Sequence, residues 1–228
     1  MHTSALRTNT NAFKFLIEFW TKHCELTKAH KDWALRHIHI LQLKRGHRCY
    51  LEGDMHKTVY LVTSGALARV HITEAASAKD SEEGNKNVAG QKKKNAVKKN
   101  KRRISSIATP GMALMTTRHL FSNTPSKGEI VALHANTVIL AIPYNAVRPF
   151  VTVDPCVTIL NNMVLHKKKK QLGDLIYVLQ SGEGTQRLET FREEMRELYD
   201  ILSYQECADF IGISVPTVKR KASNPKKN

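Results

Sequence analysis

The stretch that decides the C-terminal fold is residues 203–221, Ser-Tyr-Gln-Glu-Cys-Ala-Asp-Phe-Ile-Gly-Ile-Ser-Val-Pro-Thr-Val-Lys-Arg-Lys. Its spacing from Ala208 to Gly212 and Val218 is typical of a helix-turn-helix. Ala208 is small where two helices would cross, Gly212 accepts the positive φ of a tight turn, and Val218 is directed into a small core. The stretch therefore predicts two short helices joined by one sharp turn.

Capping signals support both predicted helices. Ser203 and Glu206 have the spacing of a capping box at the start of the first helix. Ser214 can cap the second helix, and Pro216 suits its first turn, where a missing N–H costs no hydrogen bond. Agreement between the turn, the core positions and the caps makes the helix-turn-helix a stronger prediction than any one signal would.

The second helix of this stretch is basic and predicts contact with double-stranded DNA. The candidate DNA-binding residues are Ser214, Thr217, Lys219, Arg220 and Lys221. Hydroxyl, ammonium and guanidinium groups of this kind bind phosphate oxygens and base edges. The alternative interpretation is a surface helical hairpin with a basic end. The spacing, the two caps and the charge together favour DNA binding.

Charge is unevenly distributed along the 228 residues, whose formal net charge is +16. Basic residues gather in three places: 92–103, 167–170 and 219–227. Local basic clusters attract polyanions such as nucleic acid or an acidic membrane surface. For residues 91–103, however, a solvated loop is the favoured interpretation, because segment 74–103 has almost no large apolar residue and is expected to be mobile.

Several classes of site are not predicted. Cys24, Cys49, Cys156 and Cys207 are far apart without a CxxC pair, so neither zinc nor an iron–sulfur cluster is expected. The sequence has no His-x-His motif followed by a Glu at a suitable distance, and no metal site is predicted. Nucleophile-elbow, Walker and paired-carboxylate signatures are missing from the sequence, so we do not expect an enzyme.

The location is inferred from the same sequence. Four separated cysteines are typical of a reducing compartment. The N-terminal residues show no secretory signal pattern, and no apolar run reaches membrane-spanning length. We expect a cytoplasmic protein without a membrane partner.

Hydrophobic periodicity divides the chain into helical and β regions. Helices are predicted at 11–23 and 27–36, and the period changes towards two from residue 37. Short strands with glycine turns, including 104–107, 129–133 and 137–142, predict an all-β barrel or sandwich. One long helix is predicted at 154–181, a break at 181–184, and a single helix at 186–201.

The long helix predicts a dimer contact. The apolar residues that follow one side of it are Val157, Leu160, Val164, Leu165, Leu172, Leu175, Ile176 and Leu179. A helix much longer than the average of about 11–12 residues usually needs a partner, and a symmetric coiled-coil contact supplies one. Alternatively, the stripe packs on its own β domain, and both contacts can coexist on different faces.

Three further motifs carry a family resemblance. They are Leu43-Lys-Arg-Gly-His-Arg-Cys-Tyr-Leu-Glu-Gly-Asp54, Val59-Tyr-Leu-Val-Thr-Ser-Gly65 and Thr109-Pro-Gly111. In these motifs and in the order of its parts, nearly the whole chain resembles the Crp/Fnr superfamily of bacterial transcription regulators. Arg187-Leu-Glu-Thr-Phe191 and Leu202-Ser203 resemble members from the Bacteroidetes branch.

The resemblance implies an α+β fold in three parts. Residues 1–150 would form an antiparallel β-roll of the cyclic-nucleotide-binding type with flanking helices. Residues 151–182 would be the dimerisation helix, with the homodimer contact along 154–181, and residues 183–228 the helix-turn-helix domain. The resemblance also implies DNA and RNA polymerase as partners.

Departures from the family pattern affect the effector pocket. The family's ligand-binding Gly-Glu pair falls on Met115 and Thr116, and its Arg falls on Ser126. Arg118 and Lys127 are nearby candidates, although a lysine lacks the planar fork that pairs with phosphate. We expect cyclic AMP to bind weakly if at all and predict no cofactor, leaving another small effector open.

The DNA-reading end departs as well. Family members often place Arg and Glu where this chain has Val215 and Pro216, and neither can contact a base edge through two hydrogen bonds. Arg220 matches a family base-contact position, whereas Thr217, Lys219 and Lys221 suit phosphates. Two functions therefore remain: a homodimeric DNA-binding regulator, or a sensor or scaffold with a vestigial helix-turn-helix.

Overall fold

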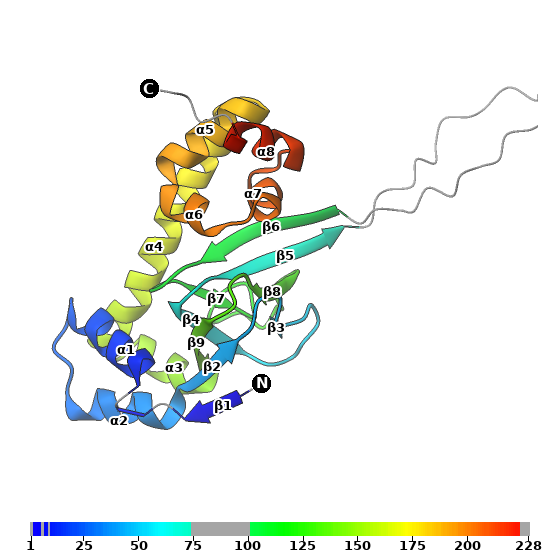
Figure 1. Cartoon of the computed structure of the whole chain (residues 1–228). Helices are drawn as coiled ribbons and strands as arrows, with labels where there is room; N and C mark the ends of the chain where they lie inside the picture. The colour runs from blue at the N-terminus through cyan, green and yellow to red at the C-terminus, as the bar shows by residue number, and fades with distance from the viewer. Residues whose placement is uncertain (1, 6, 9, 74–100, 224–228) are drawn as a thin grey trace, which may run out of the picture.

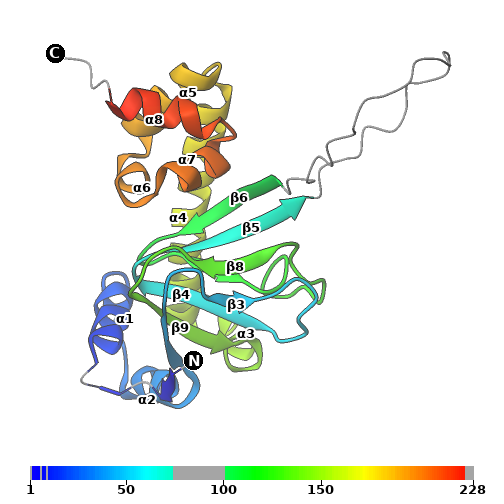
Figure 2. The same ribbon diagram turned by 45° about the vertical axis from the view of Figure 1, so that its right-hand side comes forward.

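The computed structural model describes residues 2–5, 7–8, 10–73 and 101–223. A β-roll with three flanking helices forms the N-terminal part, and one long helix leads from it to a unit of four short helices (Figure 1; Figure 2). Turning the view shows that the long helix runs behind the roll and joins the two parts (Figure 2). The observed architecture confirms the predicted α+β class.

The roll is made of two antiparallel sheets. One has the strand order β1-β2-β9-β4-β7 and the other β3-β8-β5-β6. The strands are β1 (His2–Ala5), β2 (His39–Leu43), β3 (Arg48–Tyr50), β4 (Thr58–Ser64), β5 (Leu67–Thr73), β6 (Lys101–Ala108), β7 (Ala113–Met115), β8 (Glu129–Ala132) and β9 (Thr137–Pro143). Alternate residues of these strands point between the sheets, where Val62, Leu67 and Ile139 are fully buried.

The helices are distributed around the roll and beyond it. They are α1 (Asn11–Thr21), α2 (Lys28–His37), α3 (Tyr144–Val151), α4 (Pro155–Gln180), α5 (Gly184–Glu194), α6 (Arg196–Ile201), α7 (Tyr204–Ile211) and α8 (Val215–Ser223). Helices α1 and α2 are anchored by two tryptophans, since Trp20 Nε1 donates to Cys156 O at 2.7 Å and Trp33 Nε1 to Ala146 O at 3.0 Å.

Helix α4 is both buried and exposed along its length. Asp154 caps its start by accepting from the backbone N–H groups of Cys156 and Val157. Its inner face packs on the rest of the chain through Val157, Leu160, Leu175 and Val178. The predicted contact with its own β domain is therefore present. None of the helices among the described residues is long and apolar enough to span a bilayer.

The structure differs from the sequence expectations in two segments. The single helix predicted for 186–201 is two helices, because the backbone at Met195 turns to φ −127° and ψ 41° between α5 and α6. Strand β6 starts at Lys101 rather than Ile104, because residues 101–103 pair with the end of β5. Residues 74–100, the rest of the predicted lysine-rich loop, lie outside the described residues.

Candidate nucleic-acid interface and effector region

Helices α7 and α8 form the predicted helix-turn-helix. Ala208 is 4% exposed and Val218 fully buried, so both occupy the core between the helices. Gly212 ends α7 with φ 70°, the left-handed conformation that a Cβ disfavours. Ser203 Oγ accepts from Glu206 N, and the Glu206 side chain accepts from Ser203 N, which completes the capping box. The local signals of the sequence are confirmed here.

The predicted DNA-binding residues on and before helix α8 differ in their exposure and in their partners. Ser214 Oγ accepts from Thr217 N at 3.3 Å and lies 2.7 Å from Thr217 Oγ1, so these two hydroxyls stand together at the start of the helix. Lys219 and Arg220 are exposed. Lys221 instead lies 2.9 Å from Glu189 Oε1 of α5, which holds its ammonium group beside the helix pair.

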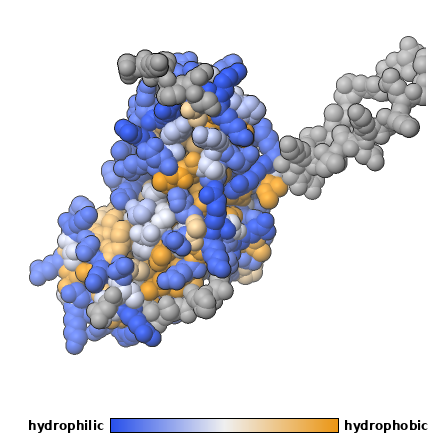
Figure 3. Space-filling model, in the orientation of Figure 1, coloured by the Kyte–Doolittle hydropathy of each residue, from blue (hydrophilic) through white to orange (hydrophobic). Residues whose placement is uncertain are grey.

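The surface around α8 suits a polar partner. The upper helical unit is largely hydrophilic, whereas hydrophobic surface gathers lower down over the roll (Figure 3). Helix α8 itself carries no acidic residue between Val215 and Ser223. Its exposed side therefore combines positive charge with hydroxyl groups, as contact with a phosphate backbone requires.

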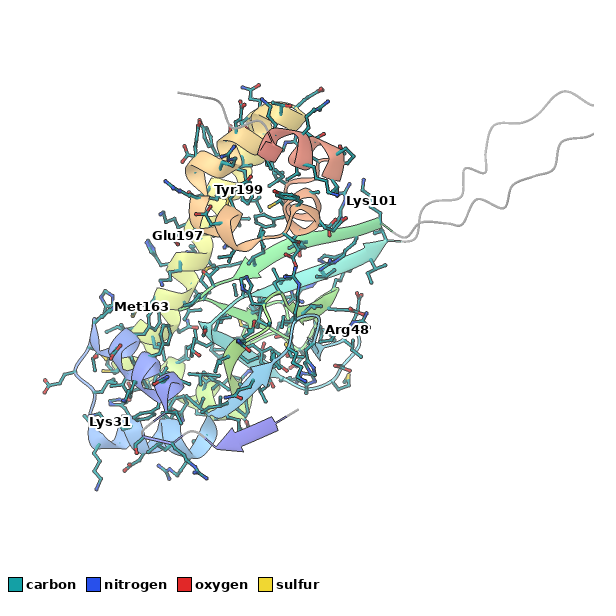
Figure 4. All side chains as sticks on the ribbon, viewed as in Figure 1. Lys31, Arg48, Lys101, Met163, Glu197 and Tyr199 are labelled. Atoms are coloured by element: carbon teal, nitrogen blue, oxygen red, sulfur yellow. The ribbon has the colours of Figure 1, made fainter. Side chains whose placement is uncertain are left out.

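The helical unit is packed against the roll through α7. Arg45 Nη2 lies 2.8 Å from Glu206 Oε1, and Arg102 Nη1 of β6 lies 3.6 Å from Asp209 Oδ2. His134 Nε2 donates to Ile201 O at 3.0 Å. The start of β6, where Lys101 is labelled, reaches the helical unit (Figure 4). The sequence predicted neither ion pair, because their partners are more than one hundred residues apart.

Apolar packing accompanies these ion pairs. Side chains from the outer face of the β3-β8-β5-β6 sheet, including Val70 and Ile104, belong to the same buried cluster as Phe210 of α7. Burial raises the pKa of Asp209, although Gln205 donates a hydrogen bond to it and Arg102 is nearby. The outer face of this sheet and the helix-turn-helix consequently share one buried apolar cluster, separate from the core between the two sheets.

The five candidate effector residues do not form one converging set of side chains. Thr116 is buried and its hydroxyl is engaged, since it donates to His56 O at 2.8 Å and accepts from Thr58 N at 3.0 Å. Ser126 is also buried, and its backbone N–H donates to Thr116 O. Arg118 and Lys127 are exposed, and Met115 is half-buried.

Two basic residues that were not among the predicted effector candidates, Arg69 and Lys168, lie in this region. Arg69 of β5 donates through Nη1 to Lys127 O at 3.1 Å and through Nη2 to Met115 O. Lys168 of α4 donates to Ser106 Oγ of β6, and its Nζ lies 3.5 Å from Gln171 Oε1. Burial, reinforced by the charge of Arg69, lowers the pKa of Lys168 to about 8. Burial also lowers the pKa of Arg69.

A separate cavity of about 840 Å³ lies where the roll, α4 and the α5–α6 turn meet. Pro110 and Met112 line it from the roll, and Met195 from the helical unit. Its charged lining is mixed, since Lys167 and Lys170 face Glu193, Glu194 and Glu197. This balance of charge favours no one class of ligand.

One group of three metal-ligand types occurs within the described ranges: His30, Asp154 and Cys156. Thr27 N–H donates to His30 Nδ1 at 3.0 Å, so that nitrogen accepts and the ring proton is on Nε2. Nε2 then donates to Asp154 Oδ2 at 3.0 Å. Both ring nitrogens are therefore engaged in joining the cap of α2 to the cap of α4.

Sequence comparison does not place the chain in a family. No protein-family model matches the sequence, and no curated protein matches it either.

Structure comparison does find similar folds. A CooA mutant from Carboxydothermus hydrogenoformans is 18% identical with a TM-score of 0.58, and the match covers 96% of this chain and 86% of CooA. The regulator CLP from Xanthomonas campestris is 16% identical with a TM-score of 0.56, over 87% of this chain and 91% of CLP. A Eubacterium rectale protein described as a transcriptional regulator of the Crp/Fnr family is 14% identical with a TM-score of 0.56, over 89% of this chain and 83% of that protein. Across most of its length, this chain has the fold of the Crp/Fnr transcription regulators.

Proposed function

We propose that the chain is a DNA-binding transcription regulator of the Crp/Fnr type. The observation that carries this proposal is the exposed basic side of α8, held by a completed helix-turn-helix. Ser214, Lys219 and Arg220 are exposed there, and the helix has no acidic residue. A recognition helix needs this combination, because phosphate contacts position it and side chains such as arginine read base edges.

A homodimer through α4 is the second part of the proposal. Leu165, Leu172 and Leu179 are 37–51% exposed and spaced seven residues apart, the repeat of a coiled-coil seam. They border the buried side of the helix, where Leu175 and Val178 pack into the shared cluster, and remain exposed themselves. A two-fold axis along α4 would pair the two apolar stripes and place two α8 helices on one duplex.

We propose that the effector region does not bind cyclic AMP appreciably. Its cassette offers Thr116 and Ser126 where a carboxylate and a guanidinium would be needed. The Thr116 hydroxyl already has two partners. Losing a charge-assisted pair typically costs about 1.5–3 kcal/mol.

In this proposal, regulation is a population shift between two placements of the helix-turn-helix. DNA half-sites about one helical turn apart accept only one spacing of the recognition helices. A signal that changed how α7 packs on β6 would change that spacing. RNA polymerase, in the cytoplasm, would be the partner of the DNA-bound dimer.

A second candidate function is a sensor or scaffold whose helix-turn-helix no longer reads DNA. Two observations favour it: the ion pairs that hold α7 on the roll, and the inability of Val215 and Pro216 to read bases. In this case, a bound ligand or protein would be the output, and α8 would bind DNA only through its charge.

Fluorescence anisotropy with a library of genomic duplex fragments, measured at several salt concentrations, separates the two functions. A regulator binds some fragments preferentially, and its affinity falls steeply with salt as counterions are released. Equal binding of every fragment would favour the sensor or scaffold. The variant Arg196→Ala, which removes an exposed charge from α6 outside the helix-turn-helix, is the control for net charge.

A further inference from the structure

Two cations without acidic partners meet in the roll. Arg69 has five N–H donors, and the hydrogen bonds described above engage it only with the carbonyl oxygens of Met115 and Lys127. Lys168 contacts the uncharged groups of Ser106 and Gln171. Within the described part of the chain, neither Arg69 nor Lys168 forms an ion pair with a carboxylate.

The geometry brings these two side chains together at Ser106. Arg69 and Ser106 are direct partners in the β5–β6 ladder, so their side chains project from the same face of the sheet. The Ser106 hydroxyl in turn contacts Lys168 Nζ across from α4. The charge of Arg69 acts on Lys168, so strand and helix supply one cation each to the same region of the roll.

The nearest charged groups around this pair are of both signs, and the carboxylate among them is bound elsewhere. His71, two residues along β5 from Arg69, has its pKa lowered by burial, by Arg69 and by Lys127. Glu52 is the acid that acts on His71, and its carboxylate accepts the Gly128 N–H at 2.6 Å. It is not among the charges that act on Arg69 or Lys168. Bringing two cations together away from water is unfavourable unless an anion joins them.

We infer that Arg69 and Lys168, with the Ser106 hydroxyl, form a binding site for the oxyanion group of a small molecule, a phosphate or a carboxylate. An arginine offers paired N–H donors in the plane of its fork, and a lysine adds a point charge from another direction. Because Lys168 is on α4, the helix that joins the roll to the helical unit, a bound anion would tie β5 and β6 to that helix.

The role of this site as an effector site rests on the proposed function, whereas anion binding itself does not. Binding is therefore tested on the DNA-free full chain by calorimetric titration. Inorganic phosphate and acetate are the two probes, each at ionic strength held constant with chloride. Saturable binding of at least one probe is expected for the unmodified protein.

Lys168→Gln should raise the dissociation constant of that probe at least tenfold, since a charge-assisted hydrogen bond is lost. Lys169→Gln, an exposed change of the same charge at the next residue of α4, should leave it unchanged. Arg69→Lys, which keeps the charge but removes the fork, should also weaken binding. The melting temperature of Arg69→Lys is measured alongside, because Arg69 also donates to two carbonyl groups of the roll. A variant that melts at the same temperature as the unmodified chain attributes the loss of binding to the lost fork.

Lack of saturable binding of either probe would overturn the inference. So would equal affinities of Lys168→Gln and Lys169→Gln, which would show that other basic surfaces, such as α8, bind the anion. Stronger binding of phosphate than acetate would identify a phosphate ligand, and the reverse a carboxylate. DNA binding of the same variants is measured separately, so failure of the anion site and failure of the proposed regulator function give different results.

Discussion

Arg45 and Glu206 form an ion pair of 2.8 Å that joins the turn between β2 and β3 to the first turn of α7. The Glu206 side chain is only 5% exposed and also accepts from the N–H and the hydroxyl of Ser203. One carboxylate therefore both caps the first helix of the helix-turn-helix and attaches that helix to the roll.

This shared role predicts energetic coupling between the two residues. In a double-mutant cycle of Arg45→Ala and Glu206→Gln, we expect a coupling energy of about 1–2 kcal/mol, typical of a charged hydrogen bond that is partly shielded from water. Unfolding in denaturant supplies the four free energies. The pair Arg48 and Glu129, within the roll, is a matched control that does not touch α7. A coupling near zero would mean that the ion pair does not stabilise the docked α7.

Arg220 is predicted to read a base. Because its side chain is exposed on α8, Arg220→Ala should cost about 1–3 kcal/mol on a preferred fragment and should reduce the preference between fragments. Lys221→Ala should instead weaken binding to all fragments by the same factor, because Lys221 is held beside Glu189 and suits contact with a phosphate. Anisotropy titrations over the selected fragments measure both effects. An unchanged preference in Arg220→Ala would contradict its role in reading bases.

The exposed leucines of α4 predict a dimer that one charge can break. Leu172 is 51% exposed at the middle of the seven-residue repeat, so Leu172→Glu would place two carboxylates opposite each other in an apolar seam. We expect this variant to sediment as a monomer at concentrations where the unmodified chain is a dimer. Met55→Glu, at an 82% exposed residue of the roll, should leave the dimer intact. A dimeric Leu172→Glu would locate the contact elsewhere.

Lys168 predicts a distinctive dependence of stability on pH. Its pKa is about 8 when folded, because burial, followed by the charge of Arg69, lowers it from the ordinary value near 10.4. Between these two values, the unfolded chain binds more protons, so the free energy of unfolding should rise with pH. The shift corresponds to a rise on the order of 3 kcal/mol, complete near pH 10.4 and absent below pH 8.

Lys168→Met removes this titrating group and supplies the control. Denaturant unfolding in phosphate-free buffer, from pH 7 to pH 10, should show the unmodified chain gaining stability relative to the variant. Tyrosine and cysteine side chains that titrate at high pH are common to both proteins and cancel in the difference. Parallel pH profiles would show that Lys168 is not desolvated in the folded chain.

The sequence by itself determined the local parts of this protein. The capping box of Ser203 and Glu206, the left-handed Gly212 and the buried Ala208 and Val218 all appear where the spacing predicted them. These features depend on groups three to ten residues apart, whose geometry is fixed once a helix forms. The long helix and the strands were predicted for the same reason, since hydrophobic periodicity reports the face that each element buries.

Only the tertiary structure decided how these parts meet. No local pattern predicts the break at Met195. The docking of α7 on β6 and the approach of Arg69 to Lys168 each bring together residues that are far apart in the sequence. Arg69 did leave a signal, because it occupies an inward position of an alternating strand, and Lys168 lies seven residues, about two helical turns, before buried Leu175. A run of lysines and a single arginine predict a shared site only once the packing of β5, β6 and α4 is known. The reason is that charge interactions depend on distance through space rather than along the chain.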